Sequence, residues 1–92
     1  MVGIPIGYFR NVNEDTLLYW IGCCLAETFP EILVVDADYK NKAVTIRVGN
    51  KYYTITVKNR YLCVEPQSKE NILKAVTLGN YIKEYLMELF DP

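Results

Sequence analysis

Few residues of this chain belong to the types that carry out chemistry, and their spacing matches no catalytic site. The 92 residues include no histidine, and the only serine is Ser68. Catalysis by a histidine base and metal sites built on imidazole are therefore excluded. The sequence places no base beside a serine or cysteine nucleophile. We predict no catalytic residue and no small-molecule substrate.

The spacing of Asp36 and Asp38 is that of a carboxylate pair on one strand. Two residues apart, they share a face of the strand and could together bind a divalent cation. Because no third carboxylate lies close to them in the sequence, we interpret them as polar residues that end a strand before a turn. We therefore predict no metal site and no cofactor.

Cys23, Cys24 and Cys63 are the chain's three cysteines. An odd number without regular spacing does not indicate a disulfide framework, and the usual C-x₂-C zinc spacing is missing. We interpret them as free thiols in a reducing compartment. Since no signal-peptide pattern and no long apolar run occurs, we predict no membrane span and a cytoplasmic location, or the host cytoplasm if the chain is viral. The composition resembles that of small archaeal and viral proteins.

Length and composition predict one small folded domain. Of the residues, 51% are hydrophobic and 23% are charged, which excludes wholesale disorder. A chain of this size buries about two-thirds of its unfolded surface. We expect a single domain over residues 1–92, in which residues 1–12 form an extended N-terminal arm or a short edge strand.

The apolar periodicity predicts an α+β fold. Helical spacing begins after Asn13, a good N-cap, and predicts a helix over 13–29. From residue 32 the period changes to two, and this region contains the turn dipeptides Gly49-Asn50 and Asn59-Arg60. Connections this short force neighbouring strands to be antiparallel. We predict a four-stranded meander in chain order, ending near residue 66.

Two details of this fold concern apolar residues that must be covered. In the first predicted strand, alternation places Leu33 and Val35 on the buried face, opposite to Asp36.

After Ser68, a second N-cap, two apolar stripes follow at helical spacing, and they change phase at Gly79. We therefore predict a C-terminal helix kinked or broken near Gly79. The two helices would cover one face of the sheet in a two-layer α-β₄-α arrangement.

The predicted helix over 13–29 is apolar nearly all round, and a two-layer domain has one core in which to bury it. Monomers rarely expose large apolar patches, so we predict a non-enzymatic protein-interaction module, a homodimer or a binder of another protein. The interface candidates lie on this helix and on the N-terminal arm: Tyr8, Phe9, Tyr19, Trp20 and Cys23. In the alternative interpretation, the arm folds back over Tyr19 and Trp20 and leaves a monomer.

Charge is segregated along the chain, although the net charge is only −1. Residues 11–39 carry six acidic residues and no basic one, whereas residues 40–64 carry six basic residues and no acidic one. Basic groups beside aromatic rings on an open sheet can pair with phosphates and stack on bases. The candidates for nucleic-acid binding are Arg47, Tyr52, Lys58, Arg60 and Tyr61. An ordinary solvated sheet face explains the same residues.

Overall fold

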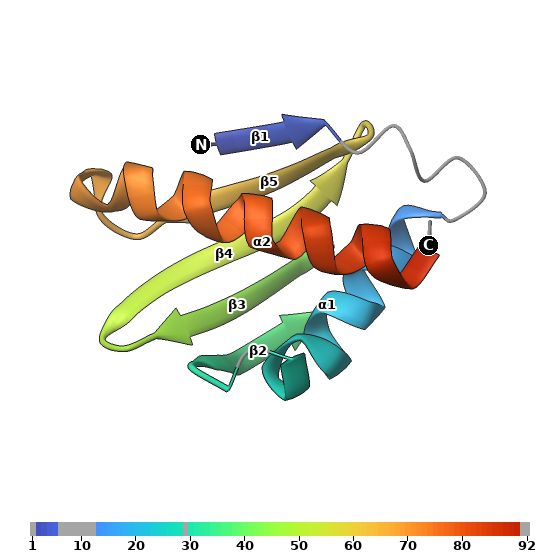
Figure 1. The fold of residues 1–92 in the computed structure, drawn as a ribbon, viewed down its shortest axis with the longest axis horizontal. Helices are drawn as coiled ribbons and strands as arrows, with labels where there is room; N and C mark the ends of the chain where they lie inside the picture. Colours follow the sequence, from blue (N-terminus) through green and yellow to red (C-terminus); the bar gives the residue numbers. More distant parts are fainter. Residues whose placement is uncertain (1, 6–12, 29, 91–92) are drawn as a thin grey trace.

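Alternating apolar residues build a five-stranded antiparallel sheet, which two helices cover on one face (Figure 1). The computed structural model describes residues 2–5, 13–28 and 30–90, without the side chains of 23–26, 28, 71, 89 and 90. The α+β class and the antiparallel sheet are confirmed. The elements in chain order are β1 (Val2–Pro5), α1 (Glu14–Thr28), β2 (Ile32–Asp38), β3 (Ala43–Val48), β4 (Lys51–Lys58), β5 (Tyr61–Pro66), the short 3₁₀ helix η1 (Lys69–Asn71) and α2 (Ile72–Phe90).

The sheet has five strands, so the predicted number of four is wrong. Its order is β1-β5-β4-β3-β2, in which the meander from β2 to β5 is the predicted one. The added strand β1 pairs antiparallel with β5, with Val2 opposite Val64 and Ile4 opposite Leu62. It is the short edge strand that the sequence offered as an alternative to an extended arm, and Pro5 is compatible with this edge position. Residues 6–12 of the predicted arm lie outside the described residues.

Capping side chains start both helical segments as predicted. The Asn13 side-chain Oδ1 accepts a hydrogen bond from the Thr16 backbone N–H at 2.7 Å. The Ser68 Oγ accepts one from the Glu70 N–H at 3.4 Å, at the start of η1. Each cap satisfies a backbone donor that has no partner within the helix.

The predicted break near Gly79 is absent, because α2 is continuous from Ile72 to Phe90. A Cβ atom at Gly79 would collide with Cδ1 of Ile4 and would lie 3.3 Å from Cγ2 of Val64. The glycine therefore allows α2 to approach β1 and β5 closely. Its role is one of packing, and helix termination is not needed to explain it.

A β-bulge in β2 reverses the predicted orientation of its first residues. The register shifts between Val34 and Asp36 and leaves Val35 without a partner. Val34 lies opposite the buried Ile46, whereas the side chain of Leu33 is 47% exposed. The prediction that Leu33 and Val35 face the core is therefore wrong. A bulge inserts one residue into the alternation, so the two halves of the strand follow opposite phases.

The core lies between the sheet and the two helices. α1 packs on β2, β3 and β4, while α2 packs on β5 and β1, so each helix covers its own part of the sheet. The largest fully buried side chains are those of Leu17, Leu18, Ile21, Ile46, Ile55, Leu62, Ile82 and Leu86. Burying an aliphatic side chain of this size contributes about 1.5–3 kcal/mol relative to leaving it exposed. This layer arrangement leaves the opposite face of the sheet uncovered by any described helix.

Candidate functional site

Three aromatic side chains meet on the outer side of α1. Tyr19 contacts Trp20 edge-to-face, with ring centroids 6.5 Å apart, and lies 6.1 Å from the ring of Tyr39. Tyr39 follows β2 and lies over Gly22, where a Cβ atom would collide with its hydroxyl group. Trp20 is half-buried and packs against the core, whereas Tyr19 is 53% exposed. Part of the apolar surface of α1 is thus covered from within the subunit.

Of the five predicted interface residues, Tyr19 and Trp20 are the two whose side chains the structure describes. Tyr8 and Phe9 lie outside the described residues, as does the side chain of Cys23. The structure brings Tyr19 and Trp20 together and adds Tyr39, which the sequence did not single out. Gly22 was the sequence signal for a neighbour at this place, since a glycine within a helix often marks the close approach of another group, which here is Tyr39.

The turn after β2 uses one of the two paired carboxylates. Asp38 accepts hydrogen bonds from the Asn41 side-chain amide at 2.7 Å and from its backbone N–H at 3.2 Å. These bonds hold the pKa of Asp38 below its ordinary value. Asp38 thus ends the strand and supports the turn. Within the described part of the chain, no group of three His, Cys, Asp or Glu side chains could hold a metal ion.

The face of the sheet away from the helices, here called the outer sheet face, carries four of the five predicted nucleic-acid-binding residues. Arg47 lies opposite Tyr52 on neighbouring strands, and Lys58 lies opposite Tyr61. The two pairs stand at opposite ends of β4, about 20 Å apart at 3.3 Å per residue. Arg60 lies beyond the sheet, in the turn between β4 and β5, with a φ of 64°.

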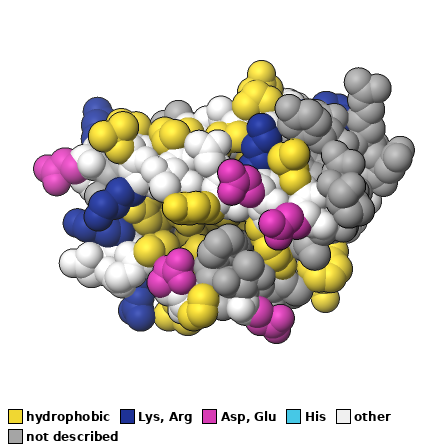
Figure 2. Space-filling view, viewed as in Figure 1, with side chains coloured by type: hydrophobic (Ala, Val, Ile, Leu, Met, Phe, Trp, Pro, Cys, Tyr) yellow, Lys and Arg dark blue, Asp and Glu magenta, His cyan; other side chains and the backbone are white. Residues whose placement is uncertain are grey.

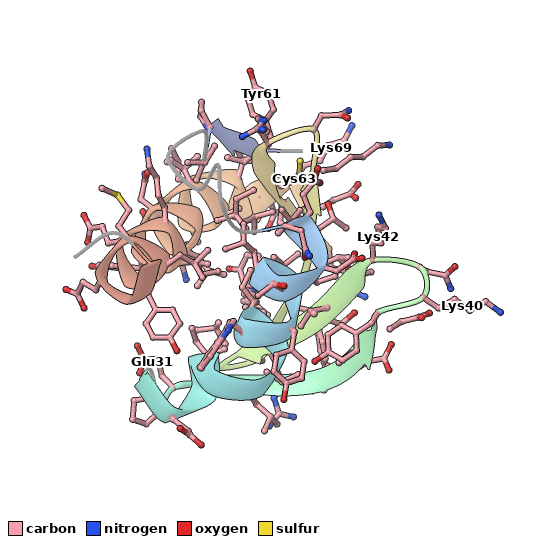
Figure 3. All side chains as sticks on the ribbon, turned by 90° about the vertical axis from the view of Figure 1, so that its right-hand side faces the viewer. Glu31, Lys40, Lys42, Tyr61, Cys63 and Lys69 are labelled. Carbon is pink, nitrogen blue, oxygen red and sulfur yellow. The ribbon has the colours of Figure 1, made fainter. Side chains whose placement is uncertain are left out.

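Figure 3 shows how the labelled residues are distributed around the sheet. Tyr61 and Cys63 belong to β5, and Lys40 and Lys42 stand on the turn between β2 and β3. Cys63 is half-buried and is not part of a disulfide, and Lys42 Nζ lies 3.7 Å from the exposed Asp15 carboxylate. Lys42 and Lys58 line one hollow with Tyr61 and Cys63, whereas Arg47 lies toward the other end of the sheet.

A hollow of about 410 Å³ opens on the helical side, between α2 and the adjoining ends of β2 and β3. Figure 2 shows hydrophobic side chains at its bottom, below α2. We call this hollow the α2 groove. Its lining residues are Glu31, Ile32, Val48, Tyr53, Leu73, Lys74, Thr77, Leu78 and Tyr81.

The two walls of the α2 groove carry opposite charges. Glu31 precedes β2 and stands on one wall, while Lys74 belongs to α2 and stands on the other. Both side chains are exposed. Among the described residues, neither takes part in an ion pair.

Two exposed apolar residues of α2 line the groove, Leu73 (81% exposed) and Tyr81. Ile72 and Val76 are exposed on the same helix outside the groove lining. The sequence showed two apolar stripes on this helix without distinguishing them. The buried stripe is the one that contains Ala75, Leu78, Ile82 and Leu86.

Tyr53 lies at the bottom of the α2 groove. Its side chain is 2% exposed, and its hydroxyl group forms no hydrogen bond with another described residue. Burial raises the pKa of this phenol above its ordinary value of 10.0. Tyr53 is therefore neutral over the physiological pH range, with a hydroxyl group available to a molecule that enters the groove.

Comparisons of the chain with protein families, with curated proteins and with solved structures found no match. None of the helices in the described ranges is both long and apolar enough to cross a membrane.

Proposed function

We propose that this chain is a non-enzymatic protein-interaction module that forms a homodimer. The observation that supports the proposal is the number of large apolar side chains on the described surface. Interface cores are enriched in such side chains, aromatic ones above all, and monomers rarely leave them in contiguous patches. The exposed side chains are those of Tyr19, Leu33, Val35, Tyr39, Tyr52, Tyr61, Ile72, Leu73, Val76 and Tyr81.

The chemistry of the chain supports a role without catalysis. The sequence has no histidine, and its single serine, Ser68, is engaged as a helix cap. Asp38 is engaged in a turn. These residues support structure, so binding is the activity that the remaining surface residues serve best.

Self-association through α1 and the N-terminal arm is the hypothesis drawn from the sequence. Tyr19 is the described residue that serves it best, because its ring is largely exposed beside Trp20 and Tyr39. The contributions of Tyr8, Phe9 and Cys23 stay predictions. A Tyr19→Glu substitution would place a charge in such an interface.

Sedimentation equilibrium of the full chain at micromolar concentrations tests the proposal. We expect a concentration-dependent species with twice the mass of the 10.6 kDa monomer. A single 10.6 kDa species at every concentration would contradict self-association.

Nucleic-acid binding by the outer sheet face is a second candidate function. The observation that favours it is the cross-strand pairing of a cation with a tyrosine at two places, Arg47 with Tyr52 and Lys58 with Tyr61. Such pairs can contact a phosphate and stack on a base. Threonines at positions 45 and 54 lie between them on the same face.

Binding to labelled single-stranded and double-stranded nucleic acid over a range of salt concentrations tests this candidate. The triple variant Arg47→Ala, Tyr52→Ala, Lys58→Ala should bind more weakly, and loss of two phosphate contacts should reduce the salt slope by about 2. Lys40→Ala, on the exposed turn after β2, is the matched control. Equal binding by the triple variant and the unmodified chain would exclude this role for the outer sheet face.

A further inference from the structure

We propose that two copies of the chain associate through the α2 groove, with Leu73 of each copy seated in the groove of the other. This inference rests on the proposed function, because it names the surface that a homodimer would use. It differs from the hypothesis drawn from the sequence, which places the interface on α1.

Leu73 and the α2 groove match in chemistry, because both are apolar and open to solvent. Leu73 projects from the rim of the groove with 81% of its surface exposed, so it contributes little to the core of its own subunit. The groove offers about 410 Å³ lined by apolar side chains, among them Ile32 and Val48. An aliphatic side chain that enters it would be removed from water, which is the main driving force of association.

A second copy is the occupant that this face fits, because the projecting residue and the groove belong to the same surface. In a two-fold dimer one patch contacts itself, so that residue i meets residue j of the partner and j meets i. A face that carries both a projection and a matching hollow meets this condition. Another protein would have to supply both features separately.

The charges on the two walls satisfy the same symmetry. When two such faces meet about a two-fold axis, the α2 wall of one copy can face the β2 wall of the other. Lys74 would then meet Glu31 of the partner subunit, and the contact would occur twice. Because neither side chain has an ion-pair partner among the described residues of its own subunit, both are available for this contact.

The apolar surface extends beyond the groove along α2. Tyr81 is exposed and lines the groove two turns after Leu73, whereas Ile72 and Val76 are exposed on the other side of Leu73 around the helix. A specific interface buries about 800 Å² on each partner, which is more than one leucine and one groove supply. These neighbouring residues provide the additional contact area.

Introducing a charge at Leu73 is the first test. Leu73→Glu should abolish the dimer in sedimentation equilibrium, because a carboxylate would have to enter an apolar groove. Since Leu73 is exposed, the substitution leaves the core intact. Leu33→Glu makes the same change on the outer sheet face, at another exposed leucine, and should leave the dimer unchanged.

Charge reversal is the second and sharper test. Glu31→Lys and Lys74→Glu, each alone, would place like charges in both symmetric contacts and should weaken dimerisation at least tenfold. An equimolar mixture of these two variants restores unlike pairs across the interface, so heterodimers should form with close to the original affinity. Lys58→Glu and Glu65→Lys, on the outer sheet face, are the matched controls and should have no effect.

The outcomes separate this inference from the proposed function. Loss of the dimer with Leu73→Glu and its recovery in the mixture would support the inference. A dimer that withstands Leu73→Glu but dissociates with Tyr19→Glu would place the interface on α1, overturning the inference while leaving the proposed function standing. An unmodified chain that is monomeric throughout would contradict the proposed function itself.

Discussion

The two helices of this protein differ in whether other segments of the chain cover their outward-facing apolar residues. On α1, Trp20 packs against the core, and Tyr39 from the next turn covers Gly22. On α2, Leu73 is exposed almost completely and has no such cover among the described residues. The sequence suggested the opposite, because α1 has the more uniformly apolar pattern.

This difference shows that the apolar content of a helix and its exposed apolar surface are separate properties. A helix that is apolar all round still needs a neighbour to cover its second face, and for part of α1 that neighbour is the turn between β2 and β3. α2 covers a different part of the same sheet face, over β5 and β1. The exposed stripe of α2 is therefore the more accessible surface for a partner.

The largest effect is expected at Ile82, the buried counterpart of Leu73 on the same helix. Ile82→Ala should lower the free energy of unfolding by about 2–5 kcal/mol, because it removes fully buried methyl groups and leaves a cavity. Leu73→Ala, measured at a concentration low enough to keep the chain monomeric, should change it by no more than about 0.5 kcal/mol. Urea titration followed by circular dichroism measures both. A loss of more than 2 kcal/mol at Leu73 would mean that its side chain is covered within the subunit.

The glycines of the two helices provide the second test. Gly79→Ala should lower the free energy of unfolding by about 1 kcal/mol, because displacement of Ile4 and crowding of Val64 outweigh the gain in helix propensity. Gly22→Ala should leave it unchanged or raise it by up to about 1 kcal/mol, since the Tyr39 hydroxyl at the end of a turn side chain can move aside. Thermal and urea unfolding measure both variants. Equal effects would show that the two helices are packed equally tightly.

The smallest effect concerns the pH dependence contributed by Tyr53, below the α2 groove. Because burial raises its pKa in the folded state, the unfolded chain loses this proton first as the pH rises above 10.0. The contribution of Tyr53 to stability is therefore fully present below that pH and is lost as the pH rises through the folded-state pKa. Tyr53→Phe should flatten the decline in stability between neutral and alkaline pH.

Urea titrations at neutral and alkaline pH compare Tyr53→Phe with the unmodified chain. If the stability of both declines equally as the pH rises, the phenol of Tyr53 is solvated in the folded state and the groove is more open at its bottom than the burial of Tyr53 indicates.

Sequence reasoning succeeded where the signal was local. In β4, Tyr53, Ile55 and Val57 alternate with polar residues, and all three are buried as that alternation predicts. The side chain of Asn13 caps α1 for the same local reason. Reasoning from the sequence left the N-terminal segment open as an arm or an edge strand, because the pairing of β1 depends on the edge that β5 offers. It failed at Val35, where a bulge changes the phase of β2.

The amino-acid sequence by itself determined the class of each long element and the meander, because helical caps, a period of two and two-residue turns act over a few neighbouring residues. Only the tertiary structure decided which apolar residues are covered. Tyr39 reaches Gly22, and Ile4 reaches Gly79, across long separations in the chain. Coverage depends on where distant segments meet in space, so the exposed stripe of α2 and the groove beside it could be found only in the folded chain.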